Sequence, residues 1–118
     1  MDLRIEDLLA EGLDDWVSLH NVVWHARELA DGDEAEVPGL VRQVLTAIIG
    51  GGLMAPGNLG EPGHIGRDLW AGEPEELIER VMAECEQLGW NPRGEGCWFA
   101  NTAEGDRRAR DDEGGNDG

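Results

Sequence analysis

The feature that most constrains this chain is the segment VPGLVRQVLTAII, residues 37–49, which is followed directly by three glycines. Its apolar residues recur at the three- and four-residue steps of one wide helical face: Val37, Leu40, Val41, Val44, Leu45, Ile48 and Ile49. Pro38 is tolerated in the first turn, and the glycines at 50–52 supply a C-terminal cap and a turn. We therefore predict a helix over residues 37–49 that turns its apolar face to the core.

Three further helices are predicted from the same spacing. Residues 2–11 carry a short apolar stripe that ends at Gly12. A second helix starts after Asp14 or Asp15, either of which can cap it. Its stripe consists of Trp16, Leu19, Val23, Ala26 and Ala30. Another helix begins with Pro74 at its first position and ends at Gly89, and its outer face is almost entirely carboxylate.

The segments LMAP (53–56) and GCWFANT (96–102) are predicted to be two short strands that pair antiparallel. The glycine-rich segment 57–73 is expected to be a loop held by Leu59, Ile65, Leu69 and Trp70. Residues 103–118 consist almost only of Gly, Asp, Glu and Arg, so we expect a disordered acidic tail from Ala103 onward.

These elements predict a mostly α (α+β) fold with four helices and a small two-stranded antiparallel sheet. At 118 residues the chain suits one domain, which we place at residues 1–102 and describe as winged-helix-like, a helix-turn-helix core with a modified wing. An irregular helical bundle without a sheet is the alternative.

The net charge of −17 limits the partners that such a domain can bind. Residues 1–102 alone hold 20 acidic residues and 6 arginines, a net charge of −14, and 11 of those acids lie in residues 1–36. Such a body repels the phosphate backbone, so nucleic acid is an unlikely partner, and it favours a basic protein. The plain alternative is that the charge keeps the protein soluble.

Nothing in the sequence marks a catalytic or metal site. His20 and His25 are five residues apart, which turns them away from each other on a helix, so no zinc or other metal site is expected. Ser18 and Cys97 have no base placed to activate them, and the glycine-rich segments lack the Lys and Ser or Thr of a phosphate-binding loop. We expect a protein that is not an enzyme and has no cofactor.

The sequence also predicts where in the cell the protein acts. No charged start followed by an apolar run is present, and no segment approaches the roughly 18 apolar residues that span a bilayer. Cys85 and Cys97 suit a reducing compartment, where they are expected to be core residues without a disulfide. We therefore expect a cytoplasmic protein without a membrane partner.

Trp24 is the residue that most suggests a binding surface. It falls off the apolar stripe of its helix and stands with His20 and Arg27 on the other flank, a combination typical of protein-binding hot spots. We predict that it anchors a protein interface together with the acids of the N-terminal third. The predicted protein-binding residues are Asp14, Asp15, Trp24, Glu28, Asp31, Asp33, Glu34 and Glu36.

Residues 38–57, 77–90 and 96–105, which include LVRQVLTAIIGGGLMAPG, the helix end CEQLGWNP and GCWFANTAEG, resemble a family of small acidic actinobacterial proteins with a winged-helix-like layout. The use of arginine for all nine basic residues is in keeping with a GC-rich genome of that kind. Members of the group resemble, in size and charge, the immunity proteins of bacterial toxin systems. The resemblance carries over no functional residue.

Three functions remain open from the sequence. The leading hypothesis is a non-enzymatic, immunity- or antitoxin-like module that masks a basic partner, either a toxin or a nucleic-acid enzyme. The second is a DNA mimic whose carboxylates stand in for phosphates, at Glu75, Glu76, Glu79, Glu84 and Glu86. The third is a winged-helix regulator that reads DNA through a local basic patch of Arg27, Arg42 and Arg67.

Overall fold

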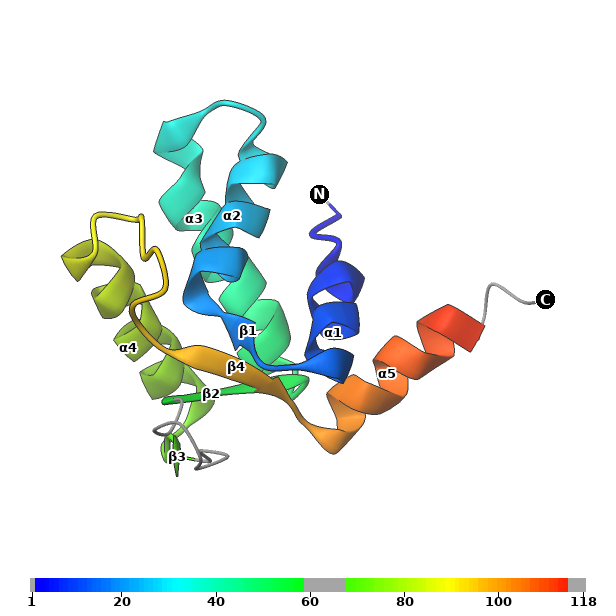
Figure 1. Ribbon diagram of the computed structural model, residues 1–118. Helices are drawn as coiled ribbons and strands as arrows, with labels where there is room; N and C mark the ends of the chain where they lie inside the picture. The colour runs from blue at the N-terminus through cyan, green and yellow to red at the C-terminus, as the bar shows by residue number, and fades with distance from the viewer. Residues whose placement is uncertain (1, 59–67, 115–118) are drawn as a thin grey trace.

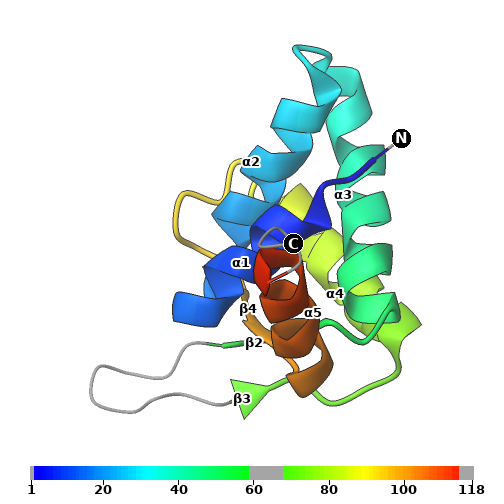
Figure 2. The same ribbon diagram turned by 90° about the vertical axis from the view of Figure 1, so that its right-hand side faces the viewer.

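The computed structural model describes residues 2–58 and 68–114, and within these ranges the chain forms five α-helices and a small antiparallel sheet (Figures 1 and 2). None of the helices in these two ranges is long and apolar enough to cross a bilayer. The α-helices are α1 (Ile5–Asp14), α2 (Leu19–Ala30), α3 (Val37–Leu45), α4 (Pro74–Gln87) and α5 (Ala103–Gly114). The strands are β1 (Val17–Ser18), β2 (Met54–Asn58), β3 (Asp68–Leu69) and β4 (Trp98–Asn101).

Helices α2 and α3 run antiparallel and side by side in both views, joined by a short connector that includes the 3₁₀ turn η1 (Glu34–Glu36) (Figures 1 and 2). The predicted helix over 37–49 is confirmed, and it extends through a π-helical turn, η2 (Thr46–Gly50). A helix-turn-helix DNA-binding motif instead crosses its two helices steeply, at about 90–120°. The pair is a helical hairpin, and the winged-helix description is not confirmed.

The sheet has the strand order β1-β4-β2-β3, and every neighbouring pair is antiparallel. The predicted pairing of LMAP with GCWFANT is confirmed, with Met54 opposite Asn101 and Pro56 opposite Phe99. Strands β1 and β3, of two residues each, do not follow from the sequence pattern, and β3 lies in the segment 57–73 for which a loop was expected. Phe99 is fully buried in the central strand β4, so the sheet supplies the lower boundary of the helical core.

Helix α1 differs from the prediction at both ends, and helix α2 differs at its start but ends at Ala30 as predicted. Helix α1 passes through Gly12 because that glycine leaves room for the side chain of Asn101, whose Nδ2 donates to the carbonyl oxygen of Leu9 at 2.9 Å. Helix α2 is capped by Ser18, whose hydroxyl accepts from the N–H of Asn21 at 3.1 Å, and not by Asp14 or Asp15. Trp16 therefore precedes the helix.

The expectation of a disordered tail from Ala103 is wrong for residues 103–114, which form α5 and pack along α1. Thr102 caps this helix by accepting from the N–H of Gly105 at 3.1 Å. Small residues allow close packing: Ala109 is buried, and a Cβ at Gly105 would overlap the carbonyl oxygen of Leu53. The composition of this segment predicted disorder because it lacks large apolar residues. Helix α5 is stabilised instead by its cap and by the close approach of its backbone to Leu53. Residues 115–118 lie outside the described ranges.

Candidate functional site

Trp24 stands on the outer side of α2 with 55% of its surface exposed. Its neighbours in the helix, Val22, Val23 and Ala26, are fully buried against the core, so the helix phase itself turns the indole outward. Tryptophan is enriched among the residues that carry most of the binding energy of protein interfaces. The surface on both sides of Trp24 is therefore the candidate site.

On one side of Trp24 lies a hollow of about 270 Å³ between α1 and α2, here called the α1 hollow. Its lining residues come from both helices and the segment before α1: Arg4, Asp7, Leu8, Glu11, Asn21, Trp24, His25 and Glu28. Asp7, Glu11 and His25 were not among the residues predicted from the sequence to bind a partner. A stripe within one helix cannot show which acids of a neighbouring helix will face it.

On the other side lies the connector hollow, about 280 Å³, lined by Trp24, Arg27, Glu28, Asp31, Gly32 and Glu34. The guanidinium of Arg27 is already engaged, because its Nε donates to Glu34 at 3.1 Å and its Nη2 donates to the carbonyl oxygen of Trp90 at 2.6 Å. Glu28 and Asp31 form no ion pair with any residue in the described ranges. The hollow therefore keeps negative charge beside an open indole face.

The structure brings together four of the eight predicted binding residues and separates the others. Trp24, Glu28, Asp31 and Glu34 line the connector hollow. Asp33 caps the 3₁₀ turn by accepting from the N–H of Ala35. Asp14 and Asp15 lie at the C-terminal end of α1 and line neither of the two hollows beside Trp24.

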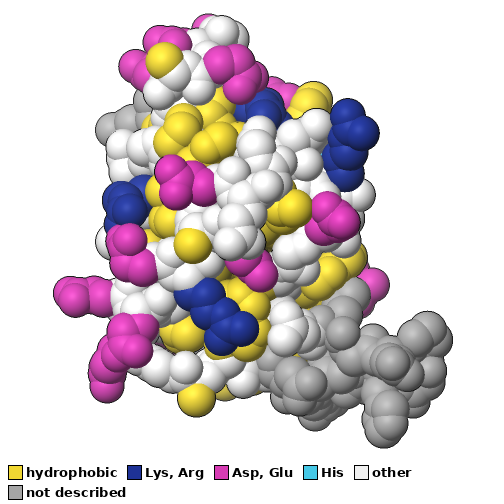
Figure 3. Space-filling view, turned by 90° about the vertical axis from the view of Figure 1, so that its left-hand side faces the viewer, with side chains coloured by type: hydrophobic (Ala, Val, Ile, Leu, Met, Phe, Trp, Pro, Cys, Tyr) yellow, Lys and Arg dark blue, Asp and Glu magenta, His cyan; other side chains and the backbone are white. Residues whose placement is uncertain are grey.

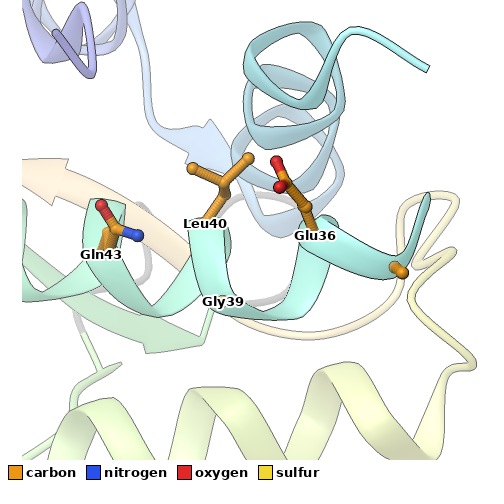
Figure 4. A pocket seen from close by; sticks show the side chains of 5 residues that line it. Glu36, Gly39, Leu40 and Gln43 are labelled. Atoms are coloured by element: carbon orange, nitrogen blue, oxygen red, sulfur yellow. The ribbon is translucent and has the colours of Figure 1, made fainter. Parts of the chain in front are cut away.

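Glu36, the last predicted residue, lines a third hollow of about 370 Å³ at the start of α3 (Figure 4). Figure 4 shows the side chains of Glu36, Leu40 and Gln43 rising from the same side of the helix. Gly39 leaves the wall open, since a Cβ there would meet nothing within 4 Å. This hollow offers one carboxylate and no exposed aromatic side chain, so it is a weaker candidate than the two beside Trp24.

The acidic face of α4 is partly neutralised by the protein itself. The carboxylate of Glu84 accepts from the backbone N–H of Cys97 at 3.0 Å. Glu79 forms an ion pair with Arg42, and this hydrogen-bonded guanidinium lowers the pKa of the Glu79 carboxyl. Two of the five carboxylates that a DNA mimic would present are therefore committed to internal contacts.

The basic patch that a DNA-reading function requires is not assembled by the described part of the chain. Arg27 and Arg42 are each held by a carboxylate, and Arg67 lies outside the described residues. Figure 3 shows the face of the molecule that lies on the left in Figure 1. The arginines on that face stand apart from one another, with acidic and apolar side chains between them. Another arginine, Arg80, lies over the ring of Trp70 at 3.6 Å from its centroid.

Neither cysteine thiol is activated as a nucleophile. Both are free and buried, and burial raises the pKa of Cys85 to about 12 and raises that of Cys97 as well, with the Glu84 carboxylate adding to each shift. A thiol with a raised pKa is a poor nucleophile at neutral pH. Over residues 2–58 and 68–114, no three His, Cys, Asp or Glu residues come close enough together to hold a metal ion.

Comparisons with known proteins add no family to this picture. The chain matches no protein-family model, no curated protein and no solved structure. The functional argument therefore depends on the geometry around Trp24.

Proposed function

We propose that this protein is a non-enzymatic, cytoplasmic binding module that holds a basic protein partner at the surface around Trp24. The observation that carries the proposal is the 55% exposed indole between two hollows whose carboxylates, on Asp7, Glu11, Glu28 and Asp31, have no ionic partner in the described ranges. An aromatic anchor supplies binding energy, and uncompensated carboxylates select a basic partner and accelerate its approach.

This surface suits an immunity- or antitoxin-like role, in which the module covers the basic functional surface of a toxin or a nucleic-acid enzyme. The internal pairing of Glu79 and Glu84 on α4 favours the Trp24 surface over the acidic face of α4 as the point of contact. The pairing of Arg27 and Arg42 with carboxylates argues against nucleic acid as the ligand.

The test is affinity capture from a lysate of the source organism at low salt with three forms of the full chain. These are the wild type, Trp24→Leu, and a control that carries Glu75→Gln and Glu76→Gln on exposed positions of α4. We expect the wild type and the control to retain the same basic protein, Trp24→Leu to lose it, and raised salt to release it.

Circular dichroism and thermal unfolding would verify that all three forms are folded. Retention of the same proteins by Trp24→Leu would overturn the proposal, and so would retention of DNA in place of a protein.

A further inference from the structure

The imidazole of His25 forms the floor of the α1 hollow and has one nitrogen without a partner. The side chain is 9% exposed, and its Nε2 lies 2.6 Å from the carbonyl oxygen of Leu3. A carbonyl oxygen only accepts, so Nε2 donates to it, and in the tautomer that carries its proton on Nε2 the other nitrogen, Nδ1, is an acceptor. Nδ1 makes no hydrogen bond to any described residue. Nδ1 is not one of the buried polar atoms that lack a partner, so it is open to solvent at the hollow and can accept a hydrogen bond from a donor that enters there.

The walls of the same hollow are suited to a cation. Asp7 and Glu11 of α1 and Glu28 of α2 contribute three carboxylates without an ionic partner in residues 2–58 and 68–114. Arg4 contributes one positive charge at the rim, which leaves a net charge of −2 for the lining. The exposed indole of Trp24 forms the remaining side.

We propose that the α1 hollow binds the guanidinium of an arginine in a basic protein segment, an inference that rests on the proposed function and specifies its partner. The guanidinium stacks on the Trp24 indole, donates to His25 Nδ1 and forms ion pairs with Glu28 and the acids of α1. Arginine fits this set better than lysine because its planar fork presents five donors and stacks on aromatic faces.

The chain itself shows this kind of stacking at a second tryptophan. The guanidinium of Arg80 lies 3.6 Å from the centroid of the Trp70 ring. At Trp24 the nearest arginine of α2, Arg27, is drawn away to Glu34 and to the carbonyl oxygen of Trp90. The Trp24 indole could therefore take part in the same cation–π contact as Trp70, but no arginine of the described residues lies over its ring.

The test compares two synthetic peptides of equal length and charge, one of alternating Arg and Gly and one of alternating Lys and Gly, titrated into the full chain at low salt. We expect the arginine peptide to bind the wild type about fivefold more tightly than the lysine peptide. Trp24→Leu should weaken its binding and abolish that preference, while the Glu75→Gln, Glu76→Gln control should keep both. Equal affinities for the two peptides would overturn the inference.

The role of His25 can be tested without a substitution, which could break its hydrogen bond to the carbonyl oxygen of Leu3. In ¹⁵N NMR spectra of the imidazole side chains, we expect the His25 Nδ1 resonance to shift when the arginine peptide is added. A resonance that does not move would remove His25 from the site. Capture of a Trp24-dependent protein from the lysate, together with equal peptide affinities, would leave the proposed function standing and reject the arginine inference alone.

Discussion

Two acidic surfaces in the described part of the chain, one on α4 and one around Trp24, differ in what their carboxylates already bind. On α4, Glu79 is paired with Arg42, and Glu84 accepts a hydrogen bond from the backbone N–H of Cys97, just before β4. Around Trp24, the carboxylates of Asp7, Glu11, Glu28 and Asp31 line two hollows without an ionic partner among the residues described, and Glu34 is paired with Arg27. Two carboxylates of α4 thus make internal contacts that contribute to the fold, whereas most of those around Trp24 remain available to a partner.

The comparison shows why composition alone does not locate a binding site in a chain of charge −17. Acidic residues occur on nearly every helix, so their number is uninformative. What distinguishes the Trp24 surface is the combination of open carboxylates, hollows and an exposed aromatic ring. Each of the following predictions separates carboxylates that contribute to the fold from those that remain free.

The largest expected effect on stability is at Glu84. Glu84→Ala removes the acceptor of the buried Cys97 N–H and should lower the free energy of unfolding by about 2 kcal/mol. Glu86→Ala removes the same charge from an exposed position of α4 and should have almost no effect. Urea unfolding of both variants measures the difference. Equal losses would mean that the Glu84 contact is not structural.

The next largest effect concerns binding. Glu28→Gln together with Asp31→Asn neutralises two carboxylates beside Trp24 and should weaken binding of the arginine peptide about threefold to tenfold. Asparagine tolerates the left-handed backbone at position 31, where φ is 51°, so the fold should be kept. Calorimetry against the Glu75→Gln, Glu76→Gln control tests the prediction. An equal loss in the control would reduce the site to general charge attraction.

The smallest effect is at the exposed pair of Arg42 and Glu79. The pair lowers the pKa of Glu79 in the folded state, so its contribution is present above the unfolded-state pKa and disappears as the pH falls through the folded-state value. Arg42→Ala should therefore lower stability slightly at about pH 7 and by less at about pH 3. Thermal unfolding at both pH values measures this. A difference that grows toward acid pH would contradict the assignment.

The sequence predicts the parts of the fold in which large apolar residues repeat at a regular spacing. Such spacing located α3 and α4, and the apolar segments at 53–56 and 96–102 gave the β2–β4 pair. It did not reveal β1, since two residues cannot display a period. It also did not reveal α5, which is stabilised by a Thr102 cap and by the close approach of Gly105 to the backbone of Leu53.

The candidate site was predictable where it lies on one helix and its connector. Trp24, Glu28, Asp31 and Glu34 followed from the helix phase and the acidic connector, and they line one hollow. Asp7 and Glu11 join Trp24 only because α1 packs beside α2, and His25 enters the hollow because its ring bonds to Leu3. These contacts depend on tertiary packing, which the spacing of residues along a single sequence does not show.

The strand order also implies the sequence in which the molecule assembles. Helices α2 and α3 are neighbours along the chain, so they can meet after closure of a short loop. Strand β4 occupies the middle of the sheet, yet it pairs with Val17, 82 positions earlier, as well as with β2. Contacts between such distant segments form slowly. During synthesis, the helical hairpin that carries Trp24 can therefore form before residues 98–101 have been made. The sheet cannot form until they are, because β4 lies between β1 and β2.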